Sequence, residues 1–260
     1  MADPVALFSD DADLGVIRIK AGRASFPNLI YAIYDGQGPD ALVVDPGWGA
    51  ELICDLLAAR GRVLRGVLLT HSHRDHTAAA ATLAELAQVP LYGSAACLAT
   101  VEAPMARKNA IRETSELQIG AIRVQALMTP GHTSCSISYL VGGHLFPGDT
   151  LFIEGCGLAT EPGGRAEELF ATCQMLKRLI PDEVRVFPGH EYKRPVGASF
   201  AEVKASNLYL QINDQDNFTA FCNRPRRGRV PPTVGSVPEM QAEILDIHLP
   251  EPSFPFKEAI

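Results

Sequence analysis

Side chains that commonly bind metal ions are concentrated in one short segment of the sequence. His71, His73, Asp75 and His76 lie within "THSHRDH", directly after the apolar run "VLRGVLLT". This short segment holds three of the seven histidines in the chain. Imidazole and carboxylate groups suit zinc, iron or manganese. A single loop of this kind could supply two ligands to each of two neighbouring metal ions.

Three further candidate ligands each lie in a turn at the end of a predicted strand or just before one. His132 lies in "TPGHTSCS", Asp149 in "FPGDTLF" and His190 in "FPGHE". Each motif alone indicates a turn more often than a ligand. A core histidine or a capping aspartate has no reason to recur after Pro-Gly at three strand ends. The joint pattern therefore predicts a metal site at one edge of a sheet.

The number of candidate ligands indicates two metal ions. Seven ligands are too many for one tetrahedral zinc and suit two ions that keep positions open for water. We expect two divalent metal ions, with zinc favoured over iron or manganese. The predicted assignment is His71, His73 and His132 for the first ion, Asp75, His76 and His190 for the second, and Asp149 as the bridge. His144 and His248 lie outside these motifs and are interpreted as surface or structural residues.

Alternating strands and helices must position these residues. Runs rich in β-branched and aromatic residues predict strands over 28–35, 41–47, 63–70, 122–128, 136–141, 144–149 and 184–189. Helical spacing of apolar residues predicts helices over 49–60, 76–88, 164–180 and 199–214. This alternation favours a layered α/β fold. We expect a metal-binding domain over 1–195 and a helical or loop subdomain over 196–260 that caps the substrate side.

The composition excludes several classes of protein. The 260-residue chain has a net charge of −7, which argues against general nucleic-acid binding. No uncharged apolar stretch approaches the roughly 18 residues of a membrane span, and the first residues lack a secretory signal, so we expect a cytoplasmic protein that does not bind membranes. The six cysteines include no CxxC pair, which indicates reduced thiols. Cys135 and Cys156 are interpreted as buried packing residues.

The motifs "THSHRDH", "TPGHT", "GDTLF" and "GHE" resemble those of the metallo-β-lactamase superfamily, and within it the glyoxalase II-like branch. The resemblance covers roughly residues 15–195. It implies a four-layer αββα sandwich with metal ions at the edge of two sheets, and its ligand positions coincide with the seven residues above. "VVDPG" also matches a family motif, so Asp45 either orients a ligand histidine or opens a turn.

This machinery suits hydrolysis of esters, amides or thioesters. Two metals that bridge a hydroxide would give a nucleophile at neutral pH, since metal binding lowers the pKa of water from about 15.7 to near 7. We expect Asp75 to orient that nucleophile and accept its proton, and so to be the catalytic residue. A thiolate, with a pKa near 8.5, leaves without a strong general acid. The motifs contain no other obvious acid, which fits a thioester substrate.

Two known functions of the branch require residues that this chain lacks. Glyoxalase II, a hydroxyacylglutathione hydrolase, has Lys and Tyr after its "GCG" to hold glutathione, whereas this chain has Leu158, Ala159 and Thr160. Persulfide dioxygenases bind one iron and show "GCGRTDF" and "PxHD", whereas this chain has neither the Arg nor the Asp and reads "PGHE". Both functions stay open as alternatives. A non-enzymatic scaffold ranks last because all seven ligands are present.

A third group of relatives fits better. "GDTLFIEGCGLATEPGGRAEELF" and "NLYLQIND" resemble glyoxalase II-like hydrolases that accompany polyketide synthases and release acyl groups from acyl carrier protein. Arg224, Arg226, Arg227 and Arg229 in "NRPRRGR" could bind the phosphate of a phosphopantetheine arm, or could form a solvated loop. Tyr192 could line the thiol channel or simply pack. We therefore expect an acyl thioester substrate, with an acyl carrier protein as a candidate partner. The oligomeric state is left open.

Overall fold

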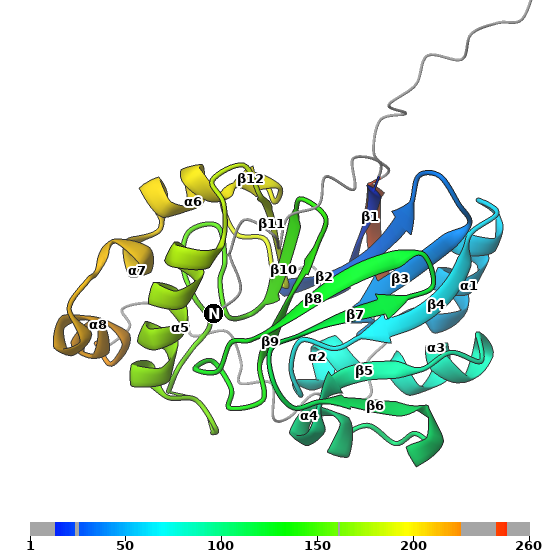
Figure 1. Cartoon of the computed structure of the whole chain (residues 1–260), viewed down its shortest axis with the longest axis horizontal. Coiled ribbons are helices and arrows are strands. Elements are labelled where there is room, and N and C mark those ends of the chain that lie inside the picture. Colours follow the sequence, from blue (N-terminus) through cyan, green and yellow to red (C-terminus); the bar gives the residue numbers. More distant parts are fainter. Residues whose placement is uncertain (1–13, 24–25, 161, 225–242, 249–260) are drawn as a thin grey trace, which may run out of the picture.

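Two β-sheets form the centre of the protein (Figure 1). The computed structural model describes residues 14–23, 26–160, 162–224 and 243–248. Within them, the first sheet has the order β13 (Glu243–His248), β1 (Leu14–Arg23), β2 (Phe26–Asp35), β3 (Asp40–Val44), β4 (Val63–Leu68), β5 (Leu91–Ser94), β6 (Lys108–Ile111). The second has the order β12 (Ala198–Ser199), β11 (Arg185–Pro188), β10 (His144–Gly148), β9 (Ile137–Val141), β8 (Ile122–Met128), β7 (Ser115–Ile119). Both sheets mix parallel and antiparallel pairs.

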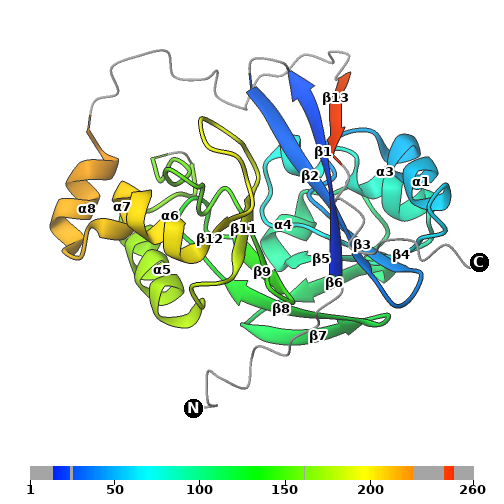
Figure 2. The same cartoon turned by 90° about the horizontal axis from the view of Figure 1, so that it is seen from above.

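Helices cover the outer face of each sheet, and Figure 2 shows the two sheets between them. On the first sheet lie α1 (Ala50–Ala58), α2 (Arg74–Thr77), α3 (Ala80–Leu86) and α4 (Ala95–Ala99), followed by the 3-10 turn Met105–Arg107. On the second lie α5 (Ala166–Leu179), α6 (Phe200–Ser206), α7 (Leu208–Gln211) and α8 (Gln215–Cys222). The predicted four-layer αββα sandwich is therefore confirmed.

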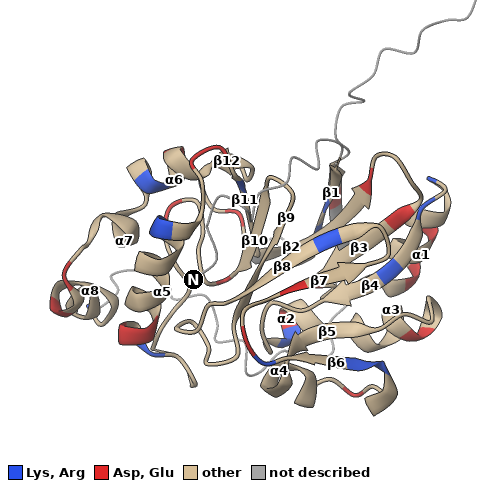
Figure 3. Ribbon diagram, in the orientation of Figure 1, with Lys and Arg blue, Asp and Glu red and all other residues tan. Residues whose placement is uncertain are grey.

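Strand β2 shows how the layers are held together. Because successive side chains of a strand point to opposite faces, both faces of a central strand can be apolar. Leu29, Tyr31 and Ile33 pack between the two sheets, whereas Ile30 and Ala32 pack against the helices of the first sheet. In Figure 3 the inner strands β9 and β10 are tan along their length, because they carry no Lys, Arg, Asp or Glu.

The two sheets are also joined by backbone hydrogen bonds at the edge where the predicted ligand loops begin. Leu29 N donates to Gly189 O at 2.8 Å, and Ile137 N donates to Thr70 O at 2.8 Å. Each bond links a strand of one sheet to the residue that directly precedes a candidate ligand, His190 or His71. The ligand loops of both sheets therefore start from fixed backbone positions.

Several predicted elements end earlier than the sequence pattern suggested. Strand β3 stops at Val44, because Asp45 adopts a left-handed backbone conformation with φ of 50°. The helix predicted over 76–88 begins at Arg74 and consists of the short α2 followed by α3. The helix predicted over 199–214 divides at Asn207, whose side chain accepts a hydrogen bond from Tyr209 N and starts α7.

The chain after residue 195 contacts both halves of the sandwich. Helices α6, α7 and α8 share an apolar core with α5, through side chains such as Phe200 and Phe218. Strand β13 pairs with β1 in the first sheet, an element that the sequence pattern did not predict. Strands β5 to β7 and helix α8 were also not predicted. Among the described residues, no helix is both long and apolar enough to cross a membrane.

Candidate metal centre

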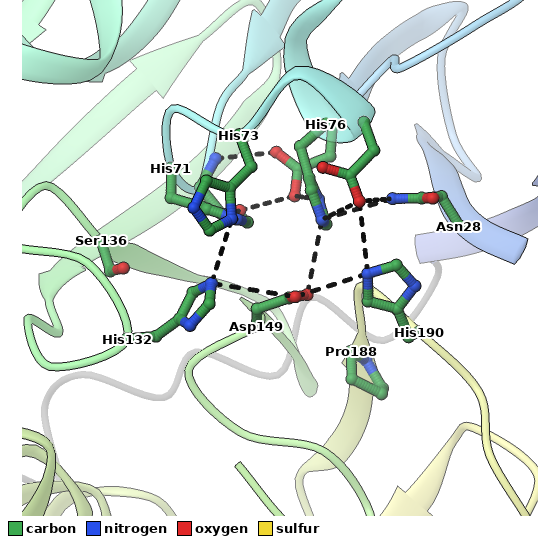
Figure 4. A network of polar contacts seen from close by, with 12 residues as sticks. Asn28, His71, His73, His76, His132, Ser136, Asp149, Pro188 and His190 are labelled. Atoms are coloured by element: carbon green, nitrogen blue, oxygen red, sulfur yellow. Dashed lines mark hydrogen bonds and ion pairs between the residues drawn. The ribbon is translucent and has the colours of Figure 1, made fainter. Parts of the chain in front are cut away.

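All seven predicted ligands lie together at the edge of the two sheets (Figure 4). His71 and His73 lie in the loop after β4, and Asp75 and His76 lie on α2. The other three come from the second sheet, with His132 between β8 and β9, Asp149 directly after β10 and His190 after β11. Short turns after several strands therefore place residues that are up to 119 positions apart in the sequence around one point.

Three histidines form a first group. Nε2 of His71 lies 3.0 Å from Nδ1 of His73, and Nε2 of His132 lies 3.2 Å from that same Nδ1. Three ring nitrogens that face one another cannot all be satisfied by the one proton that His73 Nδ1 can carry. A cation among them would satisfy all three lone pairs.

Asp75, His76 and His190 form a second group beside the first. Oδ2 of Asp75 lies 3.6 Å from Nε2 of His76 and 3.6 Å from Nε2 of His190. One ligand atom from each of these residues lies within 4.8 Å of the others, as is also true of the first group. The structure therefore divides six of the seven candidate ligands into the two triads that the sequence predicted.

Asp149 contacts both groups. Its Oδ1 lies 3.5 Å from Nε2 of His76, and its Oδ2 lies 3.4 Å from Nε2 of His190. Oδ2 also lies 3.9 Å from Nε2 of His132, which belongs to the first group. Of the seven candidate ligands, only this carboxylate lies within ion-pair distance of histidines of both triads.

Hydrogen bonds behind the imidazole rings set the orientation of two ligand histidines. Nδ1 of His132 donates to Leu158 O at 2.9 Å, and Nδ1 of His190 donates to Pro27 O at 3.0 Å. A carbonyl oxygen can only accept, so each Nδ1 carries a proton. The Nε2 atom, which faces the other ligands, is therefore the atom that can offer a lone pair to a metal ion.

Asp45 orients two further histidines from behind. Its carboxylate accepts hydrogen bonds from Thr70 N at 2.8 Å, Thr70 Oγ1 at 2.6 Å and His76 Nδ1 at 2.9 Å. Since the hydroxyl proton of Thr70 is directed to Asp45, Thr70 Oγ1 accepts from His71 Nδ1 at 2.9 Å. The hydrogen bond between Asp45 and His76 agrees with the prediction that Asp45 orients a candidate ligand histidine. The carboxylate of Asp45 also lies close to His71 and His76, and these hydrogen bonds account for that arrangement without a third metal ion.

Burial and neighbouring charges shift the proton affinities in the two groups differently. Burial and the adjacent imidazoles lower the pKa of His73 to about 4 and hold the pKa of His71 well below its usual value. Burial alone would lower the pKa of His76, but Asp75, Asp149 and Asp45 together raise it to about 10. His71 and His73 therefore offer neutral imidazoles near neutral pH, whereas His76 holds a proton that a cation would have to displace.

The residues present fit a pair of divalent cations. Oδ1 of Asp75 and Oδ1 of Asp149 are buried and accept no hydrogen bond from the described residues. The donor set consists of imidazole nitrogens and carboxylate oxygens, which suits zinc, iron or manganese. Gly189 leaves the space open, because a Cβ at this position would lie 2.5 Å from Asp149 Oδ1 and 2.6 Å from His76 Cε1.

Asn28 is a site residue that the sequence analysis missed. Its Nδ2 donates to Asp75 Oδ2 at 2.9 Å and lies 3.3 Å from His76 Nε2. The available signal was a polar residue at the start of the apolar strand β2. Phe152 was also missed, and its ring lies 6.1 Å from the ring of His190 and 5.1 Å from that of Tyr192.

The predicted substrate-binding residues lie in different parts of the molecule, and only some of them are among the described residues. Tyr192 is 51% exposed and packs against Phe152, so it lies at the rim of the site. The Arg224 guanidinium lies over the Phe221 ring at 3.4 Å, on the outer helical layer. Arg226, Arg227 and Arg229 lie outside the described residues. Cys135 and Cys156 are buried, as predicted, and burial holds the pKa of Cys156 well above its usual value.

Comparison with known families agrees with the site geometry. The family model described as the metallo-beta-lactamase superfamily matches residues 26–190, which include all seven candidate ligands. The chain belongs to the metallo-beta-lactamase superfamily. The loop 70–76 carries the motif "THSHRDH", and the turns at 132, 149 and 190 carry "TPGHT", "GDTLF" and "GHE".

Similar metallo-beta-lactamase superfamily proteins include enzymes with named activities. "Probable polyketide biosynthesis zinc-dependent hydrolase BaeB" of Bacillus velezensis is 34% identical over 80% of this chain and 93% of that protein. A hydroxyacylglutathione hydrolase of Idiomarina loihiensis is 36% identical over 75% of this chain and 74% of that protein. The crystal structure of ETHE1 from Myxococcus xanthus is 31% identical, with a TM-score of 0.66 over 76% of this chain and 88% of that one. Together with the His and Asp groups, the two relatives named as hydrolases support a metal-dependent hydrolase.

Proposed function

We propose that this protein is a dinuclear metal-dependent hydrolase that cleaves acyl thioesters, with acyl groups on the phosphopantetheine arm of an acyl carrier protein as its substrates. The observation that carries the proposal is the pair of adjoining ligand groups with one carboxylate between them. The proposed ligands are His71, His73 and His132 for one ion, Asp75, His76 and His190 for the other, and Asp149 for both. Zinc is the favoured metal, in line with the names of the polyketide hydrolases.

Two metal ions bound by these residues would supply a nucleophile from water at neutral pH and would polarise the substrate carbonyl. The protein's own residues orient the reaction. Asp75 has one oxygen fixed by Asn28, and its Oδ1 is buried and accepts no hydrogen bond from the described residues. We assign Asp75 as the residue that directs the attacking oxygen and accepts its proton. Phe152 and Tyr192 border the site.

The choice of a carrier-bound thioester rests on two observations. The relatives BaeB and PksB, each 34% identical to this chain, are named as polyketide biosynthesis hydrolases. The stretch Leu158, Ala159 and Thr160 lacks the Lys and Tyr expected for glutathione binding, and Leu158 lies beside the site because its carbonyl accepts from His132. A thiolate leaving group has a pKa near 8.5, so it needs no strong acid.

We also propose that the chain divides functionally near residue 195, with the segment 196–260 bordering the substrate side. Support comes from Asn207, whose Nδ2 donates to Phe152 O at 3.0 Å and Gly155 O at 2.9 Å. Helices α6 and α7 thus fix the loop that follows Asp149 and carries Phe152 to the rim. Tyr192, Arg224, Arg226 and Arg227 stay proposed substrate-binding residues, and the cytoplasmic location stays a prediction.

The deciding experiment follows free thiol released from acyl thioesters by zinc-loaded protein. The panel contains an acetylated acyl carrier protein, an acyl-coenzyme A and a hydroxyacylglutathione, and Asp149→Ala serves as the inactive control. We expect the highest kcat/KM on the carrier protein. Faster turnover of the glutathione thioester would favour a hydroxyacylglutathione hydrolase, the activity named for several relatives. No turnover on any thioester would contradict the proposal.

Elemental analysis of the purified protein separates the hydrolase from the iron-dependent alternative. We expect two metal ions per chain and no oxygen uptake. One iron per chain, with oxygen consumed in the presence of glutathione persulfide, would identify a persulfide dioxygenase instead.

A further inference from the structure

We propose that Asn28 is a positioning residue that orients the second ligand group, Asp75, His76 and His190. The inference rests on the proposed metal-binding function and adds to it a residue that contacts no reacting atom. Asn28 lies at the start of β2, and its side chain is 2% exposed. Figure 4 shows it beside His76 and directed into the ligand cluster.

The position of Asn28 on its strand shows that a polar residue there needs a specific partner. By the alternation of β2, Asn28 shares a face with Ile30 and Ala32, which pack in the apolar core under the helices. Burying an amide without hydrogen bonds destabilises a protein. A buried Asn at this position is therefore stable only because it hydrogen-bonds within the ligand cluster.

The hydrogen bond of Asn28 assigns different roles to the two oxygens of Asp75. A carboxylate can only accept, so the amide nitrogen of Asn28 must face it, and Nδ2 donates to Oδ2 at 2.9 Å. Oδ1 is buried and has no hydrogen-bond partner among the described residues. The bond therefore fixes the rotation of the carboxylate and leaves Oδ1 available. Because the amide is neutral, it orients Asp75 without placing a competing positive charge in a cation site.

The backbone around Asn28 fixes the third member of the same group. Pro27 O accepts from His190 Nδ1 at 3.0 Å, and Leu29 N donates to Gly189 O at 2.8 Å. Asn28 and His190 also form an antiparallel bridge. One three-residue stretch thus holds Asp75 of helix α2 and His190, which follows β11 of the second sheet, in one geometry. In the first group, by contrast, the hydrogen bonds of the histidines run to Thr70, to one another and to Leu158 O.

The test measures zinc affinity at the two sites by competition with a chromophoric chelator. Asn28→Ala removes the donor, and Asn28→Leu removes it while keeping a side chain of similar size. We expect both variants to bind one zinc as tightly as the unmodified protein and to bind the second roughly 10- to 100-fold more weakly, as found for residues that orient metal ligands. Wild-type affinity at both sites in a folded Asn28 variant would overturn the inference.

Two further variants separate positioning from a general loss of stability. Asp40→Ala removes a buried carboxylate that accepts hydrogen bonds from Arg65 Nε and Ala121 N at the end of β3 opposite to Asp45, and it should keep both zinc affinities. Asp75→Asn weakens the second site directly, so Asn28→Leu should add little in that background if it acts through Asp75. Fully additive losses would contradict the inference. If the unmodified protein bound fewer than two zinc ions, the dinuclear proposal itself would fail, and the inference with it.

Discussion

At the scale of single residues, hydrogen bonds behind the imidazole rings orient the side chains of the candidate metal centre. His132 and His190 are fixed by carbonyl oxygens, and His76 and His71 are fixed by Asp45, directly and through Thr70. These contacts hold protons on the Nδ1 atoms and direct the Nε2 atoms towards the site. His73 differs, since it presents Nδ1 to the other histidines.

Asp149 provides the most direct test of the ligand assignment. Its two oxygens contact histidines of both groups, so Asp149→Ala should reduce metal binding at both sites and abolish hydrolysis. Elemental analysis after dialysis and the thiol-release assay measure the two effects. A variant that retained both ions would show that the bridging role is wrong.

Metal binding should release protons, because of the charge distribution around His76. Asp75, Asp149 and Asp45 raise the pKa of this histidine to about 10 against the effect of burial, so the metal-free protein carries its proton at pH 7.5. A metal ion must displace that proton from Nε2, while Nδ1 keeps its bond to Asp45. Zinc titrations by calorimetry in buffers of different ionisation enthalpy measure the release. Identical heats in all buffers would contradict the prediction.

At the scale of elements, the strands deliver ligands to a common edge, and short turns give these ligands their direction. Asp149 follows β10, and His190 follows the neighbouring strand β11, which runs parallel to it. Gly189 lies between β11 and His190 and allows the backbone to pass close to Asp149 and His76. The turn therefore needs a residue without a side chain at this point.

Gly189→Ala should disrupt the site even though alanine is small. Its Cβ would lie 2.5 Å from Asp149 Oδ1, which forces the ligand to move, and overpacking of this kind costs typically about 1–3 kcal/mol. We expect weaker zinc binding and a lower melting temperature. Gly143→Ala is the matched control, because no heavy atom lies within 4 Å of its added Cβ, and both properties should stay unchanged. Equal behaviour of the two variants would contradict the steric argument.

At the scale of the whole molecule, the candidate metal centre lies between the two halves of the sandwich. Four of the proposed ligands come from the loop after β4 and the helix α2 that follows it, and three come from turns of the second sheet. Bound ions would therefore cross-link the sheets, alongside backbone bonds such as Leu29 to Gly189. The segment after residue 195 reinforces both halves, through β13 on one sheet and α6 to α8 on the other.

Removal of the metal should lower the stability of the entire fold. A ligand at 100 times its dissociation constant stabilises the native state by about 2.7 kcal/mol. For a domain of this size, that corresponds to a fall in melting temperature of roughly 5–10 °C on chelation. Scanning calorimetry with and without a chelator measures the shift, and re-addition of zinc should reverse it. An unchanged melting temperature would indicate that no ion bridges the sheets.

Strong local patterns made most of the fold predictable. Strand 122–128 has the predicted limits, because its apolar pattern is strong and turns flank it. The short strand β5 and the terminal strand β13 were missed, since pairing partners far away in the sequence stabilise them. The helix predicted over 199–214 is interrupted at Asn207, because its side chain accepts a hydrogen bond from the backbone of Tyr209. The strand predicted over 41–47 stops before Asp45, whose side chain accepts a hydrogen bond from the distant residue Thr70.

The sequence by itself determined the family and pointed to seven candidate ligands with a proposed division into two groups, because ligand chemistry and turn motifs are local properties of the chain. Only the tertiary structure showed that Asn28, 47 positions before Asp75, reaches that carboxylate and that Asp45 orients His76. It also placed Phe152 beside Tyr192 at the rim. These contacts depend on how two sheets pack together, so the distance between their residues along the chain does not reveal them.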